Sequence, residues 1–598
     1  MLKRIITLSI LLIITALVFH SGLCGEFVLD DEYSVHRNPV LALSNPIPFL
    51  GTGFLKSYLS GDSSIAPLVQ LSYWLDLRLW GLNPWGFRLT NIFLHLLTVF
   101  FVYRLLRRLI FKDDFVKTVI ATAFFTLNPV QISAVTYISG RPAIFVALFT
   151  ILALSFYRSF EKSPSVFGKI SVLLFVLLGL FTGKAGLIVP CVVLIMESIR
   201  GGNKLWALKS VVLALVAGFY FFASYSNKLI SFPAGHYPDI VSTIILAPFV
   251  FVKYLSLVFA PISHSPFRTL TSVYTDRTLP ILVGLLTSGA YIWLMVALWR
   301  KGRIKFVFSM LLIILGLLPT LFVFDGDIIP ENALYLPSIG AAVLFAIILA
   351  KIGDAIRKKS PKLSPEIIIA VAILLYFANT AYLRNFRWTN EFLLAQSSIE
   401  DDGPTAPALT SISGMMFEMG EFDSTVIYAN RAASIDPTDF DAWNCLALGY
   451  SGLGMNDAAL WVLDTRFWTD RSFRYSERML STGKIYLNKG EISSARASFY
   501  KSTIREDFAP AYIELGKLVY DNGEYNLAIE LLEKGTKLDP FNPKIYGLLA
   551  LAYEANSDNV SAREAWHRYL ELPGVKYGET VGEEDVPGIL PTRKTKGD

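Results

Sequence analysis

The chain has 598 residues, of which 53% are hydrophobic and only 17% are charged. Because a soluble protein of this length carries about a quarter charged residues, the composition excludes an entirely soluble chain. The formal net charge is only +5, and the positive residues gather in short loops between apolar runs, which gives no argument for nucleic-acid binding. The apolar excess ends near residue 385, so we expect a large membrane domain followed by a smaller soluble one.

The N-terminal segment, residues 1–20, has the pattern of either a cleaved signal peptide or a first membrane helix. Lys3 and Arg4 precede an apolar run, and Cys24 stands where a lipoprotein signal would be cleaved. Such sites usually have Leu three residues before the cysteine, where this chain has Ser21. Because many more apolar runs follow, we favour an uncleaved first span. The chain's three cysteines have neither metal-ligand spacing nor the pattern of a disulfide framework.

The region before residue 385 contains many runs that approach the length needed to cross a membrane, about 20 mainly apolar residues. The candidate spans are 5–18, 89–102, 119–135, 142–157, 167–181, 185–196, 206–222, 279–299, 304–324, 334–350 and 367–383. A further run, 240–260, is ambiguous.

Basic loops decide how these runs are oriented. They alternate as the positive-inside rule requires only if 240–260 does not span. We therefore predict an all-α bundle of about eleven spans with a cytoplasmic N-terminus. The run 240–260 becomes a re-entrant or interfacial helix within a long external segment, 223–278, and everything after the last span is extracytoplasmic.

Two adjacent carboxylates, Asp30 and Asp31, stand just after the first predicted span. Alone, such a pair is most often part of a solvated acidic turn. Four cations fall on the same predicted side, in short loops or at span ends where positive charge is normally sparse: Arg88, Arg141, Lys184 and Arg384. Any one of them can be an interfacial anchor, but together with the acidic pair they predict a site for an anionic headgroup.

Other polar residues fall on the same side. Arg88, Asn91 and His95 have the i, i+3, i+7 spacing of one helix face that descends into the membrane. His95 by itself is more often a hydrogen-bonded packing residue than a catalyst. Glu331 precedes the run at 334–350.

The first external segment, 23–86, contains a stretch at 67–81 that mixes apolar, aromatic and charged residues at helical spacing. We predict an interfacial helix there, with four aromatic residues at the level of the lipid headgroups: Tyr73, Trp74, Trp80 and Trp85.

After Arg384 a repeat replaces the apolar runs. Alanines at positions 459, 495, 528 and 562 are separated by 36, 33 and 34 residues, the period of tetratricopeptide repeats. Aromatic and small residues take the expected positions around them, for example Tyr512, Leu515, Gly516 and Pro540. The pattern predicts a solenoid of about five repeats over 405–573, after a linker at 386–404 and before a tail at 574–598 with the composition of disorder.

The combination resembles the transmembrane and tetratricopeptide-repeat (TMTC) protein O-mannosyltransferase family, glycosyltransferases of the GT-C fold that use sugars carried on polyprenyl phosphate. The resemblance covers nearly the whole chain. It lies in short stretches whose order is specific: LDDEYSVHRNP at 29–39, LSYWLD at 71–76, GFRLTNIFLH at 86–95, NPVQ at 128–131, YISGR at 137–141, ENALYLPS at 331–338 and RNFRW at 384–388.

The chain departs from the family at several positions. The family often has His where this chain has Arg88 and Asn128, Asp where it has Ala143, Glu where it has Ala185, and Arg where it has Asn332. The acidic pair is intact.

The resemblance implies a GT-C glycosyltransferase domain at 1–385 that moves a sugar, such as mannose, to an acceptor hydroxyl at the extracytoplasmic face. Asp30 would take the acceptor's proton and Asp31 would support it, while Arg88, Arg141, Lys184 and Arg384 would hold the donor phosphate. Asn91, His95, Glu331 and Tyr335 would complete the site, and the repeats would bind an acceptor polypeptide. Because no second external acidic cluster is recognisable, we expect no metal or other cofactor.

Two alternatives stay open. The acceptor could be a lipid-linked or surface glycan instead of a protein. Alternatively, the chain could be a non-catalytic membrane scaffold that recruits partners through its repeats; the intact acidic pair argues against this and the departures from the family argue for it. A transporter is disfavoured because no inverted repeat is visible and few charged residues lie deep in the spans.

Overall fold

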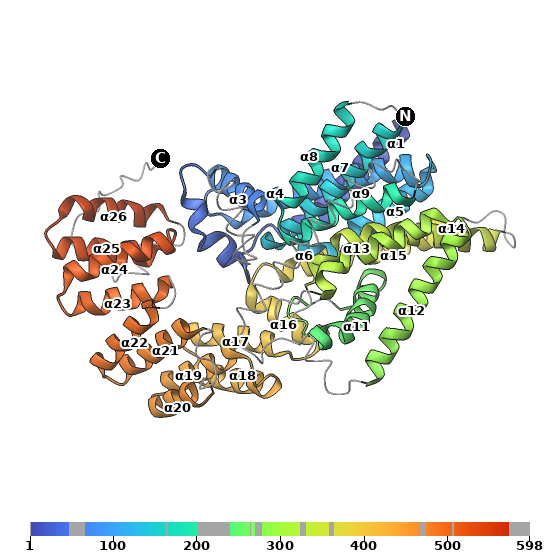
Figure 1. Cartoon of the computed structure of the whole chain (residues 1–598). Helices are drawn as coiled ribbons and strands as arrows, with labels where there is room; N and C mark the ends of the chain where they lie inside the picture. Colours follow the sequence, from blue (N-terminus) through green and yellow to red (C-terminus); the bar gives the residue numbers. More distant parts are fainter. Residues whose placement is uncertain are drawn as a thin grey trace, which may run out of the picture. The chain divides into compact units, whose positions relative to one another are not determined.

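The computed structural model describes residues 2–46, 66–162, 166–199, 240–263, 265–269, 278–322, 330–357, 364–466, 474–504 and 508–572, and the regular elements within them are helices (Figure 1). The predicted span 206–222, parts of the predicted external segment 223–278 and the predicted tail 574–598 lie outside the described residues. The chain divides into two compact units. One comprises Met1–Asp31 and Ser44–Gly449, and the other comprises Glu32–Leu43 and Tyr450–Asp598.

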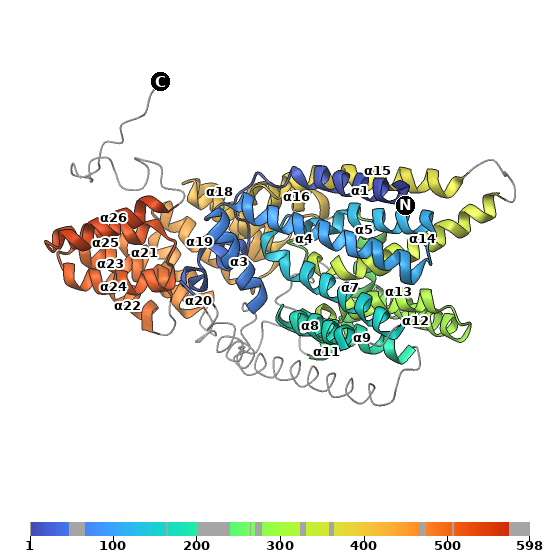
Figure 2. The same ribbon diagram turned by 90° about the horizontal axis from the view of Figure 1, so that it is seen from above.

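The first unit contains the apolar helices. They are α1 (Leu2–His20), α3 (Pro67–Trp80), α4 (Pro84–Leu105), α5 (Phe115–Leu127), α6 (Ile132–Val135), α7 (Arg141–Lys162), α8 (Val166–Leu180), α9 (Ile188–Ile199), α11 (Ile240–Phe259), α12 (Thr278–Arg300), α13 (Ile304–Phe322), α14 (Tyr335–Arg357) and α15 (Pro365–Arg387). Short helical turns join some of them: η4 (Leu106–Ile110), η5 (Pro129–Gln131), η6 (Ile138–Gly140), η7 (Lys184–Leu187) and η9 (Glu331–Leu334). The helices α1, α15, α4 and α5 run side by side, and α14 packs on α5 and α13 (Figure 2).

Seven of the described helices are long and apolar enough to cross a membrane, and a bent pair raises the number to eight. Three shorter apolar helices, in α8, α9 and α11, accompany them. The chain is therefore a membrane protein with several spans, and the predicted number of about eleven stays a prediction.

The predicted continuous span 119–135 is broken in the structure. Residues 115–127 and 129–135 form two helical pieces that meet at an angle of 48°. Pro129 has no backbone N–H to continue the first helix, and the side chain of Asn128 accepts a hydrogen bond from the N–H of Val130 at 3.2 Å to begin the next turn. The break carries the chain from the bundle into the turns that form the site.

The end of the first unit holds α16 (Glu391–Asp402), α17 (Ala406–Glu418), α18 (Phe422–Ile435) and most of α19 (Phe440–Gly452). The stretch predicted as a linker, 386–404, thus contains a helix. Because α17 packs against both α16 and α18, the first repeat is continuous with α16.

The second unit holds the remaining repeats: α20 (Asn456–Arg466), α21 (Tyr475–Asn488), α22 (Ile492–Ile504), α23 (Ala509–Asp521), α24 (Tyr525–Leu538), α25 (Pro543–Ala555) and α26 (Asn559–Glu571), with η1 (Glu32–His36) and η2 (Pro39–Ala42). All four alanines that revealed the period are buried. A Cβ at Gly516 would lie 2.8 Å from Cγ of Leu532, so only glycine permits this close helix packing. The predicted helical solenoid is confirmed.

Candidate functional site

The acidic pair lies in the loop after α1, and its two side chains have different surroundings. Asp31 is fully buried and accepts hydrogen bonds from the N–H and Oγ of Ser139, at 2.8 and 2.7 Å. Burial raises the pKa of Asp31 to about 6, although the bonds from Ser139 oppose the shift. Asp30 is exposed and accepts a hydrogen bond from the hydroxyl of Tyr137 at 3.0 Å. Only Asp30 can therefore meet a substrate directly.

The backbone before the pair is strained. Leu29 has φ of 54°, a left-handed conformation that residues with a β-carbon rarely adopt. Its N–H donates to Oε2 of Glu391 at 3.4 Å, and the N–H of Glu26 donates to the carbonyl of Thr389 at 2.9 Å. These contacts hold the loop against the segment that joins α15 to α16.

Arg88 holds three segments of the site together. Its guanidinium is fully buried and donates to the backbone carbonyls of Glu26, Thr136 and Trp388. A Cβ at Gly25 would come within 2.6 Å of Nη1 of this arginine, which explains the glycine at that position. The predicted phosphate-binding role of Arg88 stays a prediction, because the structure places this side chain beneath the loop.

Arg141 forms a buried ion pair that the sequence did not predict. Its Nη2 lies 2.6 Å from Oδ2 of Asp76 in α3, and its Nε donates to Oδ1 of Asn91 at 2.6 Å. Its guanidinium lies 4.5 Å from the ring centroid of Tyr73. Burial raises the pKa of Asp76, and Arg141 opposes the shift. The guanidinium of Arg141 is thus committed to protein groups, and its predicted phosphate-binding role stays a prediction.

Tyr73 is enclosed by protein, and its predicted level in the membrane stays a prediction. It is buried, and its hydroxyl donates to the carbonyl of Ile138 at 2.8 Å, because α3 packs against α4 and places this face inward. Trp80 and Trp85 are exposed, with ring centroids 5.8 Å apart, and their predicted position at headgroup level stays a prediction.

His95 and Tyr335 form a polar contact inside the bundle. Nδ1 of His95 lies 2.6 Å from the hydroxyl of Tyr335, and its Nε2 lies 3.4 Å from Oγ1 of Thr126. Phe19 packs edge-on against the imidazole ring. These buried and mutually satisfied groups match the packing role that was expected for a lone histidine.

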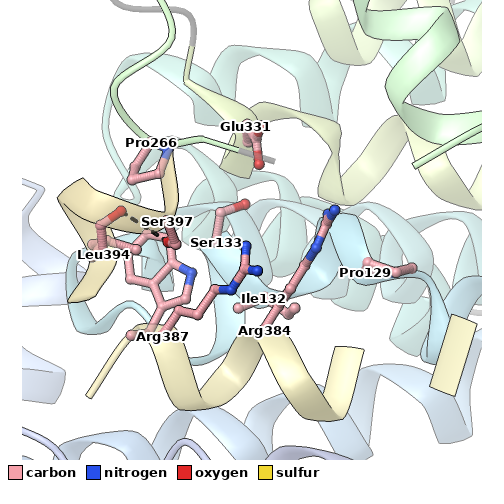
Figure 3. A pocket seen from close by; sticks show the side chains of 10 residues that line it. Pro129, Ile132, Ser133, Pro266, Glu331, Arg384, Arg387, Leu394 and Ser397 are labelled. Atoms are coloured by element: carbon pink, nitrogen blue, oxygen red, sulfur yellow. Dashed lines mark hydrogen bonds between the residues drawn. The ribbon is translucent and has the colours of Figure 1, made fainter. Parts of the chain in front are cut away.

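A pocket lies between α15, α16 and the turns around residue 130 (Figure 3). The space within it, together with the open solvent at its mouth, is about 320 Å³. It is lined by Pro129, Ile132, Ser133, Pro266, Glu331, Arg384, Arg387, Trp388, Leu394 and Ser397. Arg384 and Arg387 are one turn apart on α15, and Nη1 of Arg384 is buried without a hydrogen-bond partner in the described structure. An anion in this pocket would provide that partner.

The cations of the pocket are held by carboxylates of α16 and η9. Arg387 donates to Oδ2 of Asp401 at 2.9 Å, and Nη2 of Arg384 lies 3.7 Å from the same oxygen. Arg268 pairs with Glu331 at 2.7 Å and with Asp402. Of the three predicted phosphate-binding cations whose side chains the structure describes, Arg88, Arg141 and Arg384, only Arg384 lines this pocket.

Sequence reasoning missed Arg268, Arg387, Asp401 and Asp402. Arg387 stands in the stretch RNFRW that was singled out, and its spacing from Arg384 places both on one helix face. That spacing could have identified it. Arg268 comes from an irregular segment that has no periodicity to identify it.

The acidic pair is connected to the pocket through two aromatic residues. Tyr137, which donates to Asp30, has its ring centroid 5.3 Å from that of Trp388, and Trp388 lines the pocket. Thr136 bonds to Asn385, which in turn donates to the carbonyl of Val18 at 3.0 Å. Within the first unit, the exposed carboxylate is therefore linked to the arginine pocket by a chain of side-chain contacts.

Two predicted features cannot be placed here. The side chain of Lys184 lies outside the described part of the structure, although its backbone begins η7. Among the described residues, no group of three or more His, Cys, Asp or Glu side chains is arranged to hold a metal ion. The expectation of metal independence stays a prediction.

Comparisons with known proteins match both halves of the chain. A family model described as TPR repeat matches residues 516–557. A protein O-mannosyl-transferase of Caenorhabditis elegans is 24% identical over 66% of this chain and 57% of its own length. Protein O-mannosyl-transferase TMTC3 of Homo sapiens is 24% identical over 94% of this chain and 67% of its own length. These matches confirm the resemblance to the TMTC family, and the chain spans only part of the length of these relatives.

A third relative, protein O-mannosyl-transferase TMTC1 of Mus musculus, is 31% identical over 29% of this chain and 19% of its own length. Among solved structures, a MamA protein is 22% identical with a TM-score of 0.22, covering 28% of this chain and 90% of that chain.

Proposed function

We propose that this protein is a membrane glycosyltransferase of the GT-C type. It moves a sugar, mannose by analogy with its relatives, from a polyprenyl-phosphate donor to a hydroxyl of an acceptor protein at the extracytoplasmic face. The relatives' names support the transfer of mannose to protein. The observation that carries the proposal is the connection of the exposed Asp30 through Tyr137 and Trp388 to a pocket with two arginines.

The pocket supplies what a lipid-phosphate donor needs. A phosphate leaving group is a weak base and leaves without protonation, but its growing negative charge must be stabilised. Arg384 has an unsatisfied buried N–H group, and Arg387 is one turn away. Arginine presents several donors in a planar fork that fits phosphate oxygens. Both arginines lie at the end of α15, where a lipid-borne donor can reach them from the bilayer.

The exposed carboxylate supplies the base. The acceptor oxygen attacks the anomeric carbon while its proton passes to Asp30, and the bond between that carbon and the phosphate oxygen breaks. A direct displacement of this kind inverts the configuration at the anomeric carbon. The released products are the glycosylated acceptor and the polyprenyl phosphate. Asp31 holds Ser139, which follows Tyr137 by two residues, and so positions the group that donates to Asp30.

The repeats provide a surface for the acceptor polypeptide. Stacked helix pairs form extended surfaces that bind partners. A bound acceptor has a raised effective concentration near the membrane site, which favours transfer to full-length proteins over short peptides.

The test measures mannose transfer by the purified full chain in lipid nanodiscs. The donor is polyprenyl-phosphate-[³H]mannose and the acceptor is a mixture of extracytoplasmic proteins. Asp30→Asn keeps the shape and removes the base, so we expect turnover to fall by about 100- to 10,000-fold with the donor KM unchanged.

Asp354→Asn, at an exposed position of α14, is the matched control and should transfer at the native rate. An Asp30→Asn variant that also transfers at the native rate would contradict the proposed base. Absence of transfer in the native protein, with acceptor proteins still retained by it, would support the scaffold instead.

A further inference from the structure

The end of α16 has a charge arrangement that helix stability does not explain. Its last turn contains three acidic residues, Glu400, Asp401 and Asp402, and no basic one. The partial negative charge at a helix C-terminus disfavours carboxylates there. The helix then stops at Gly403, which has φ of 84°. Something other than the helix must stabilise these acids.

The arginines beside the pocket provide that stabilisation. Asp401 is shared by the two pocket arginines, at 2.9 Å from Arg387 and 3.7 Å from Arg384. Asp402 is held by Arg268, which also binds Glu331. The side chains of Asp401 and Asp402 retain 19% and 12% of their exposure, so both carboxylates remain in partial contact with solvent.

Counting charges shows what the pocket can accept. Arg268, Arg384 and Arg387 are joined by Lys253, which is close enough to interact electrostatically with Arg268, Asp402 and Glu331. The charged groups that line the pocket or interact with its lining are thus four cations and three carboxylates, Glu331, Asp401 and Asp402, which leaves one positive charge. A single negative charge on a ligand balances it.

The substrate and product of the proposed reaction differ in this respect. A sugar carried on polyprenyl phosphate is a phosphodiester with one negative charge. The released polyprenyl phosphate is a monoester, whose second ionisation near pH 6 gives it a charge of about −1.5 to −2 at pH 7. The single negative charge of the donor therefore balances the charge of the pocket, whereas the negative charge of the product exceeds it.

We propose that Asp401 is an internal counter-ion of the pocket, which pairs with Arg384 and Arg387 when the pocket is empty and favours a phosphodiester over a phosphate monoester. This inference rests on the proposed function. The charge of Asp401 therefore makes the product, polyprenyl phosphate, leave the pocket more readily than it would if Asp401 were uncharged. Because α16 packs against α17, the counter-ion is carried by the helix next to the first repeat.

The experiment compares two soluble probes that differ by one charge, farnesyl phosphate and methyl farnesyl phosphate. Their equilibrium binding to the full chain in nanodiscs is measured at pH 7.5. Asp401→Asn keeps the hydrogen-bonding shape and removes the charge. We expect it to bind farnesyl phosphate about tenfold more tightly, the effect of one charge-assisted contact, and methyl farnesyl phosphate with a smaller gain. Salt should reduce the difference.

Two variants control for structural effects. Asp401→Glu restores the charge and should restore the native preference. Asp423→Asn removes a distant exposed carboxylate and should change neither affinity.

Equal gains for both probes in Asp401→Asn, or no gain for either, would overturn the counter-ion. If Arg384→Gln nevertheless weakens the binding of both probes, the anion pocket of the proposed function stands even though the counter-ion does not. If the native protein binds neither phosphate better than farnesol, the pocket itself is wrong, and the counter-ion proposal falls with it.

Discussion

Two arginine clusters of the first unit look alike in the sequence and differ in the structure. Arg141 is enclosed by Asp76, Asn91 and Tyr73 and is fully buried. Arg384 lines a pocket and lies 3.7 Å from the carboxylate of Asp401. One of its buried N–H groups has no hydrogen-bond partner in the described structure. Both follow the same sequence pattern, a cation at the predicted external end of a span. An unusual position in the sequence therefore marks a candidate cation, and only its partners in the folded chain separate a packing role from a binding role.

The largest expected effect concerns the enclosed cluster. Arg141→Gln leaves Asp76 buried without its partner, which should lower the free energy of unfolding by about 3–5 kcal/mol. Thermal unfolding in nanodiscs measures the loss. Arg78→Gln, at an exposed position on the same helix as Asp76, is the matched control and should change stability little. If Arg141→Gln unfolds at the native temperature and instead loses donor binding, the two clusters are not different in kind.

A smaller effect concerns the pH dependence that Asp31 gives to the site. The pKa of Asp31 is raised to about 6. The side chain is therefore ionised above pH 6 and becomes protonated as the pH falls below 6. Protonation removes acceptor capacity for the bonds from Ser139, so turnover should fall about tenfold for each pH unit below 6. Ser139→Ala removes a hydrogen bond that lowers this pKa, and the acidic limb should move to higher pH.

The effect of Asp31 on the free energy of unfolding depends on pH in the opposite direction from its effect on turnover. Because the folded state holds the proton more tightly than the unfolded state, this group lowers the free energy of unfolding as the pH rises from about 4 to 6. An acidic limb that Ser139→Ala leaves in place would assign the pH dependence to another group.

Much of the fold could be predicted because it depends on local pattern. The apolar runs and the 33- to 36-residue alanine period gave the membrane helices and the repeats. The break at Asn128 and Pro129 was visible in the residues but was overridden by the length of the apolar run. The helix in the predicted linker, α16, was missed because its acidic end resembles a solvated segment.

The site could be predicted only in part. The turn with Tyr137 to Arg141 contacts both the stretch with Asp30 and Asp31 and the stretch with Arg384. What the sequence could not show was which cation pairs with which carboxylate. Asp76 lies 65 residues before Arg141, and Glu331 lies 63 residues after Arg268, so these pairs depend on tertiary packing.

The most direct test of the central claim is the donor KM of Arg384→Gln. The claim is that this arginine holds the donor phosphate beside the exposed carboxylate, whereas Arg141 maintains the fold. We expect Arg384→Gln to raise the KM for polyprenyl-phosphate-mannose by about tenfold, because it removes a charged contact to phosphate, with the unfolding temperature unchanged. An unchanged donor KM in a folded Arg384→Gln protein would contradict the claim.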